Sequence, residues 1–181
     1  SLTPAHCDQD HIRMLVDMNP VIPDRTAAIL GHGPSPVPKL VESSRLLEKA
    51  GATFLVFPCN TAHYFLPQVK PHINVPILNM IQETAAFIES QEINKIALLA
   101  TDGTVRTGIY QQALAGRRLS CVVPDKEAQE AIMKTIYDIK ADGDLNKAKL
   151  VFSPVIRWCH SHEVEAIIAG CTELSLILTA D

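Results

Sequence analysis

Short, almost wholly apolar segments alternate along the chain with longer segments in which apolar and polar residues recur at helical spacing. Apolar runs of this length, bounded by Gly, Pro or polar residues, favour strands that are buried on both faces. Such strands separated by helices indicate an α/β fold with parallel sheets. The predicted strands cover residues 12–18, 53–57, 75–79, 95–100, 119–123 and 165–169.

The predicted helices carry recognisable end signals. Ser35 is a candidate N-cap, Pro36 suits a first helical turn, and Gly51 ends the same segment. Pro154 is expected to bend the last helix. The predicted helices cover residues 36–51, 83–91, 101–116 (a turn and then a helix), 126–139 and 144–162.

Two of the predicted strands end in similar sequences. "FLVFPCNT" carries Cys59 and "AIIAGCT" carries Cys171, at a separation of 171 − 59 = 112 residues. This repetition predicts two similar α/β halves, residues 1–93 and 94–181, that face each other across a cleft. Because ligands of open parallel sheets bind beyond the carboxyl ends of the strands, we expect one thiol on each side of a ligand.

Paired thiols suit proton transfer at carbon. One group can remove a proton while the other returns one on the opposite face, which produces the mirror image. A turn from strand to helix is expected to favour the thiolate at Cys59 and Cys171 through the helix dipole and free N–H groups. The alternative for any single cysteine is a small buried hydrophobic residue. We assign that role, or a surface position, to Cys121 and Cys159, and no role to Cys7.

Composition and charge narrow the classes of function. The 181 residues are 47% hydrophobic with a net charge of −4, so a sizeable core is expected and a nucleic-acid partner is disfavoured. No apolar run approaches the roughly 20 residues that span a membrane. Residues 1–11 lack the pattern of a signal peptide and the cysteine number is odd, which favours the cytoplasm. The Cys and His pairs are too scattered for a typical zinc site.

The motifs "PCNTAH" and "GCTEL" resemble the paired motifs of the aspartate/glutamate racemase family, most closely its aspartate racemase branch. Residues 19–36, 98–114 and 136–145 are also similar to segments of that family. The resemblance implies two pseudo-symmetric halves with the site between them. It also implies a small acidic amino acid as substrate, racemisation without pyridoxal phosphate, metal or nucleotide, and a homodimer.

The resemblance also implies roles for individual residues. Cys59 and Cys171 match the catalytic cysteines, Cys59 serving the D-enantiomer and Cys171 the L-enantiomer. Arg25 and Lys140 match basic residues that face the substrate carboxylates, a task for which charged donors are suited. The alternatives are a loop salt bridge for Arg25 and a solvated helix end for Lys140. The remaining implied substrate-binding residues are Asn60, Thr61, Thr101, Thr104 and Thr172.

Two other functions stay open at this stage. The first strand with its Gly-rich turn and the closing strand and helix, which usually frame this family, are not apparent, so a truncated, non-catalytic binding relative is one alternative. A decarboxylase or cis–trans isomerase of small dicarboxylates is the other, although the presence of both cysteines disfavours it. Glu173 follows Thr172, where glutamate racemases typically have His, and this favours aspartate.

Overall fold

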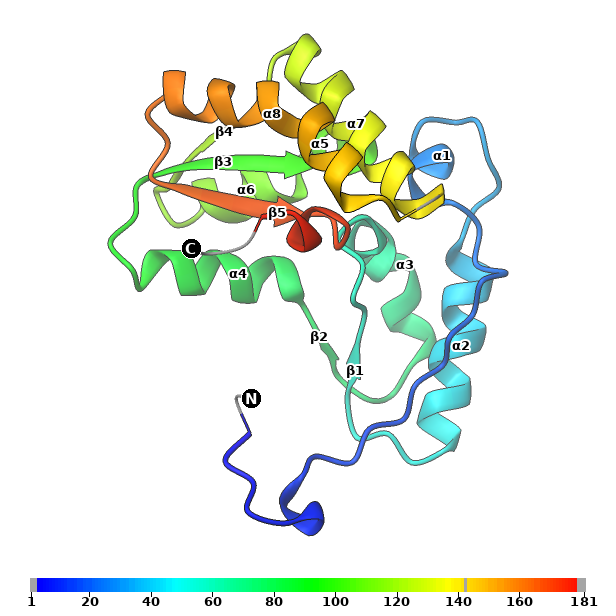
Figure 1. Ribbon diagram of the computed structural model, residues 1–181. Helices are drawn as coiled ribbons and strands as arrows, with labels where there is room; N and C mark the ends of the chain where they lie inside the picture. Colours follow the sequence, from blue (N-terminus) through cyan, green and yellow to red (C-terminus); the bar gives the residue numbers. More distant parts are fainter. Residues whose placement is uncertain (1–2, 142, 179–181) are drawn as a thin grey trace.

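The computed structural model describes residues 3–141 and 143–178, and within them it contains two parallel sheets (Figure 1). The parallel α/β fold that the sequence predicts is therefore confirmed. The strands are β1 (Leu55–Val56) paired with β2 (Ile77–Leu78), and β3 (Lys95–Ala100) between β4 (Ser120–Val122) and β5 (Ala166–Gly170).

Helices connect the strands and cover the larger sheet on both faces. In Figure 1, α7 and α8 lie over one face of β3, and α4 and α6 lie on the other side. The α-helices are α1 (Arg25–Ile29), α2 (Val37–Lys49), α3 (Leu66–Val69), α4 (Met80–Glu89), α5 (Asp102–Thr107), α6 (Ile109–Ala115), α7 (Lys126–Ala141) and α8 (Leu145–Ser161). The 3₁₀ helices are η1 (Asp8–Asp10), η2 (Thr61–Phe65), η3 (Lys70–His72) and η4 (Leu174–Leu176).

Strand β3 is the centre of the larger core. Ala97 and Leu99 belong to the cluster with α7 and α8, whereas Ile96, Leu98 and Ala100 belong to the cluster with α4 and α6. This alternation is the two-residue period of a strand, and because helices cover both faces, each of these positions is apolar.

The two sheets lie in the two predicted halves, β1 and β2 before residue 93 and the other strands after it. Residues 1–2 and 179–181, at the outer ends of these halves, lie outside the described residues. The first half has a smaller core around Leu40, Phe65 and Val69. The boundary itself stays a prediction.

The predicted strand at residues 12–18 is wrong. This segment is unpaired in the described chain, and Ile12, Met14 and Val16 are 70%, 78% and 78% exposed. Its hydrophobic pattern suits a strand, but a strand forms only where a neighbour accepts its backbone hydrogen bonds.

The predicted helices are present, with shifted ends. The predicted helix after residue 100 is divided into α5 and α6 because Gly108 adopts φ 69°, the left-handed conformation that ends a helix. Helix α4 begins three residues before the predicted start, since the Asn79 side chain accepts hydrogen bonds from the N–H groups of Ile81 and Gln82. The first turn of α2 begins at Val37, whose N–H donates to Ser35 Oγ.

No helix among residues 3–141 and 143–178 is long and apolar enough to cross a bilayer.

A glycine fixes the approach of β5 to β3 just before Cys171. Gly170 pairs with Ala100, and a Cβ at position 170 would lie 2.7 Å from the Cβ of Ala100. We expect Gly170→Ala to lower the free energy of unfolding by about 1–3 kcal/mol through overpacking, as measured by urea denaturation. Gly116→Ala is the matched control, because its nearest atom would be 3.5 Å away and φ is −59°. An equal loss in both variants would contradict this explanation.

Candidate active site

The carboxyl ends of β1 and β5 open onto one cavity of about 160 Å³. Cys59 follows β1 after two residues, and Cys171 follows β5 directly; both line the cavity. The structure thus brings together two thiols from the two sheets, as the repeated sequence predicts. Every predicted site residue except Thr104 lines this cavity.

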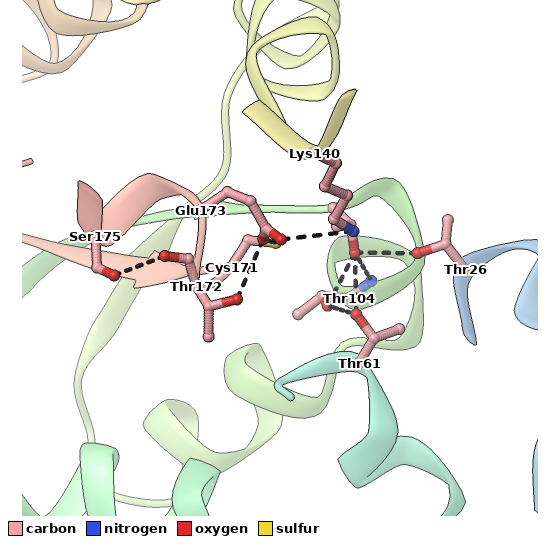
Figure 2. A network of polar contacts seen from close by, with 9 residues as sticks. Thr26, Thr61, Thr104, Lys140, Cys171, Thr172, Glu173 and Ser175 are labelled. Atoms are coloured by element: carbon pink, nitrogen blue, oxygen red, sulfur yellow. Dashed lines mark hydrogen bonds and ion pairs between the residues drawn. The ribbon is translucent and has the colours of Figure 1, made fainter. Parts of the chain in front are cut away.

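Four threonine hydroxyls form a cluster beside the cavity, which we call the threonine cluster: Thr26, Thr61, Thr101 and Thr104. Figure 2 labels Thr26, Thr61 and Thr104. The Thr61 hydroxyl lies 2.8 Å from that of Thr104 and 3.2 Å from that of Thr101. The hydroxyl of Thr26 donates to that of Thr101 at 3.3 Å. Because the first two threonines precede residue 93 and the others follow it, this cluster joins the two halves.

Thr104 differs from its predicted role. It is fully buried and does not line the cavity. Its hydroxyl lies 3.1 Å from that of Thr101, and its N–H donates to the same oxygen. Thr104 therefore supports Thr61 and Thr101 from behind, and these two residues line the cavity together with Thr26.

The turn that carries Cys59 is held by buried side chains. The N–H of Met80 donates to His63 Nε2 at 3.1 Å, so this nitrogen carries no proton, and Nδ1–H donates to the Cys59 carbonyl at 2.9 Å. The hydroxyl of Tyr110 donates to Asn60 Oδ1 at 2.5 Å. The ring of His63 thus links the Cys59 turn to the start of α4 through two hydrogen bonds, a role that the sequence does not reveal.

The expected thiolate at Cys171 is wrong. Burial raises the pKa of this thiol to about 12, and a hydrogen bond of 2.8 Å from Sγ to Glu173 Oε2 acts in the same direction. No α-helix follows directly: the next element is the short η4. Cys59 differs in this respect, because η2 after it continues without a break through α3 and η3 to His72.

Arg25 and Lys140 both line the cavity, with different partners. The guanidinium of Arg25 donates to the carbonyls of Ile22 and Pro23, and in the described chain it forms no salt bridge. The ammonium of Lys140 lies 3.9 Å from Glu173 Oε1 and 5.7 Å from the centre of the Tyr137 ring. Arg25 therefore presents a positive charge without a carboxylate partner in the part of the chain that the structure describes.

Sequence reasoning missed four polar residues of the cavity wall: Asp24, Thr26, Tyr137 and Glu173. The position of Asp24 is recognisable in hindsight, because its side chain caps α1 through the N–H of Ala27. The sequence marked Glu173 only as an indicator of substrate preference. Its contact with Cys171 across two residues depends on the turn geometry.

A second cavity of about 200 Å³ adjoins the first and shares Arg25, Pro58 and Cys59 with it. Asp17, Asn19, residues of α2 and both residues of β1 also contribute to its wall. Among the described residues, no three His, Cys, Asp or Glu side chains converge as a group that could hold a metal ion.

Two parallel sheets, each with a cysteine beyond a strand and both facing one small cavity, define an α/β protein with a paired-thiol site. The chain belongs to the Asp/Glu/hydantoin racemase family, whose model matches residues 1–181. Among solved structures it is similar to an aspartate racemase from Picrophilus torridus, with 33% identity, a TM-score of 0.88, and coverage of 98% of this chain and 74% of that one.

Other relatives are named for different amino-acid racemase activities. The broad specificity amino-acid racemase RacX of Bacillus subtilis is 28% identical over 139 residues, which are 77% of this chain and 60% of RacX. A glutamate racemase of Oceanobacillus iheyensis is 30% identical over 128 residues, 68% of this chain and 45% of that enzyme. The chain thus spans less than two thirds of the length of these two relatives.

The buried, neutral ring of His63 predicts that the stability of the protein depends on pH. Burial lowers the pKa of His63 below its ordinary value of 6.5, so the unfolded chain binds a proton more readily than the folded one. This contribution is complete above pH 6.5 and is lost as the pH falls from there through the lowered pKa. We expect the free energy of unfolding to fall in that window by at most about 1.4 kcal/mol per pH unit for this group.

Urea titrations between pH 5 and pH 8 measure this slope. His63→Gln should flatten it, whereas the exposed control His32→Gln should leave it unchanged. A slope that persists in full in His63→Gln would show that other groups cause it.

Proposed function

We propose that this protein racemises aspartate, and to a lesser extent glutamate, by proton transfer at the α-carbon between Cys59 and Cys171. The observation that carries the proposal is that these two thiols come from different sheets and line the same cavity. Membership of the racemase family supports the type of reaction. The similarity to an aspartate racemase over 98% of the chain supports the substrate.

The reaction needs one base and one acid at the same carbon. A cysteine thiolate takes the α-proton, and the electron pair of the C–H bond stays on the carbon and spreads into the neighbouring carboxylate. The other cysteine then donates its S–H proton to the opposite face, so that the product is the mirror image and the two cysteines have exchanged protonation states. Since the two side chains supply both proton transfers, the proposal includes neither pyridoxal phosphate nor a metal.

The charges of the cavity suit an acidic substrate. Arg25 and Lys140 provide two cations, and an acidic amino acid provides two carboxylates. Guanidinium binds a carboxylate through two parallel hydrogen bonds, which fixes the orientation of the substrate as well as its charge. The hydroxyls of Thr61, Thr101 and Thr172 and the amide of Asn60 add polar contacts. The size of about 160 Å³ is below the roughly 300 Å³ of typical drug-sized sites and suits a small molecule. We also propose a homodimer on the basis of the family resemblance.

The proposal predicts what each thiol variant does in D₂O. With EDTA present and no pyridoxal phosphate, the parent should convert L-aspartate to D-aspartate and incorporate deuterium at the α-carbon. Cys59→Ala should slow racemisation by at least about 10²-fold, the lower end of the roughly 10²–10⁴-fold that a positioned proton-transfer group contributes. Cys171 remains and should exchange only the L-enantiomer. Cys171→Ala should conversely exchange only the D-enantiomer.

Chiral chromatography with mass spectrometry measures inversion and exchange in the same sample. Cys121→Ala and Cys159→Ala are the matched controls, because neither residue lines the cavity, and they should racemise at the parent rate. Inversion at near the parent rate in either single variant of the paired thiols would refute the two-thiol mechanism. Carbon dioxide release in place of inversion would indicate the decarboxylase alternative.

Charge recognition gives a separate prediction. Arg25→Ala and Lys140→Ala should each lower kcat/KM for aspartate roughly 30-fold or more, because each removes a charged partner of a substrate carboxylate. This factor corresponds to a loss of about 2 kcal/mol of transition-state stabilisation. Arg13→Ala, which removes an exposed arginine outside the cavity, should have no effect. Unchanged kcat/KM in both cavity variants would contradict the placement of the carboxylates.

A further inference from the structure

Three donors converge on the carboxylate of Glu173 at the cavity wall. Cys171 Sγ donates to Oε2 at 2.8 Å, and the hydroxyl of Thr172 donates to the same oxygen at 3.2 Å. The ammonium of Lys140 approaches the other oxygen at 3.9 Å (Figure 2). The side chain of Glu173 is only 18% exposed, so these contacts replace most of its hydration. The thiol proton of Cys171 therefore lies between a sulfur and a carboxylate.

The neighbouring charges determine which of the two groups carries the proton. Burial of Cys171 and its contact with the Glu173 anion both raise the pKa of the thiol, whereas the positive charge of Lys140 lowers it. Burial also raises the pKa of Glu173, but the hydrogen bond from Cys171 and the charge of Lys140 outweigh it and hold that pKa below 4.5. At neutral pH the proton is thus on the sulfur and the negative charge on the carboxylate.

Other charged or titratable groups face the same cavity from each neighbouring element. Asp24 and Arg25 approach from the start of α1, Cys59 from the turn after β1, and Tyr137 from α7 beside Lys140. The Asp24 carboxylate accepts from the N–H of Ala27, which is its own capping contact. Within the described residues, Glu173 is the acidic side chain that contacts the Cys171 sulfur.

We propose that Glu173 is a positioning residue that keeps Cys171 protonated in the ligand-free protein, with Lys140 acting against it. This inference deepens the proposed function and rests on it for its catalytic meaning. A two-thiol racemase needs one donor and one acceptor before each turnover. Glu173 makes Cys171 the donor of the resting state, so the proposal assigns the removal of the first proton to Cys59.

The first half-cycle balances with these assignments. The Cys59 thiolate takes the α-proton of D-aspartate, and the Cys171 thiol donates its proton to the other face, which gives L-aspartate. The protein is left with a Cys59 thiol and a Cys171 thiolate beside the Glu173 anion. That arrangement places two negative charges side by side, so it is the less favourable form. Before the next D-aspartate reacts, Cys59 must lose its proton and Cys171 must gain one, with no net change in the number of protons bound.

Alkylation of the protein without substrate tests the electrostatic part directly. Iodoacetamide reacts with thiolate and not with thiol, and mass spectrometry of peptides reports each cysteine separately. At pH 8 we expect Glu173→Gln to accelerate the labelling of Cys171 at least tenfold, because the neutral amide no longer favours the protonated thiol. Lys140→Met should slow the same labelling at least threefold.

The two variants are expected to change the labelling rate of Cys171 in opposite directions, which excludes a general loosening of the fold as the cause. Loosening or unfolding would accelerate labelling in both, and it would also expose the buried Cys159, whose labelling in the same samples reports on folding. Glu130→Gln removes a charge from an exposed position of α7 and should leave Cys171 unchanged. An unchanged or slower rate in Glu173→Gln overturns the proposal.

Kinetics of the two enantiomers test the catalytic meaning. The enantiomers have equal free energies, so kcat/KM must be equal in the two directions, and an asymmetry can appear only in kcat and KM separately. L-aspartate reacts with the less favourable form of the protein, in which Cys171 is the thiolate, so we expect both kcat and KM to be higher for L-aspartate than for D-aspartate. Glu173→Gln should reduce the L-to-D ratio of kcat and the L-to-D ratio of KM. Equal kcat values for the two enantiomers in the parent refute the donor assignment. A parent that shows the expected labelling but no racemisation refutes the proposed function and leaves the control of Cys171 by Glu173 standing.

Discussion

The threonine cluster is the contact on which the geometry of the site depends. Thr61 extends from the Cys59 turn, Thr101 and Thr104 begin α5 at the end of β3, and Thr26 belongs to α1. A buried hydroxyl without a partner costs about 1–3 kcal/mol, so the hydroxyls that pair here resist separation of the two halves. Helix α5 also approaches α1 so closely that a Cβ at Gly103 would lie 3.0 Å from the Cα of Thr26. The close approach of α5 to α1 therefore requires a residue as small as glycine at position 103.

The two thiols occupy similar places in the sequence but are held by different means. Cys171 follows β5 directly, so backbone pairing with β3 fixes its position. Cys59 lies beyond a proline turn, where the buried His63 ring and the threonine cluster replace the sheet as supports. A repeated strand–Cys–Thr pattern thus gives two sites with different electrostatic surroundings. A racemase allows this difference. Its two substrates, the enantiomers, have equal free energies, but this equality does not require the two catalytic groups to have the same surroundings.

The parts of the fold that could be predicted are those that local pattern determines. The apolar run of β3 predicts a strand covered on both faces, and helices of the expected type flank it. The segment 12–18 has an equally suitable pattern and is not a strand, because pairing depends on a neighbour that no local pattern reveals. Thr104 shows the same limit for the site: the family resemblance implies a substrate-binding residue, but in the structure Thr104 is fully buried and does not line the cavity.

Contacts between distant segments were beyond prediction for a related reason. Lys140 ends α7 and Glu173 follows β5, so their approach depends on how the long α7 packs over the sheet. The resemblance to racemases indicated that a basic residue lies here, but it did not indicate an acidic partner. The same holds for His63, whose two ring contacts join the Cys59 turn to Met80.

The Lys140–Glu173 pair links recognition of the substrate to the thiol under the proposed function. A substrate carboxylate that binds Lys140 competes with Glu173 for the same cation, and the separation of 3.9 Å leaves this ammonium only loosely held. When the substrate partly neutralises Lys140, the one charge that lowers the pKa of Cys171 is weakened, and the thiol keeps its proton more firmly. A firmly held proton does not impede donation, because the α-carbanion is a far stronger base than a thiolate. Binding of D-aspartate therefore reinforces Cys171 as the donor at the moment when a donor is required.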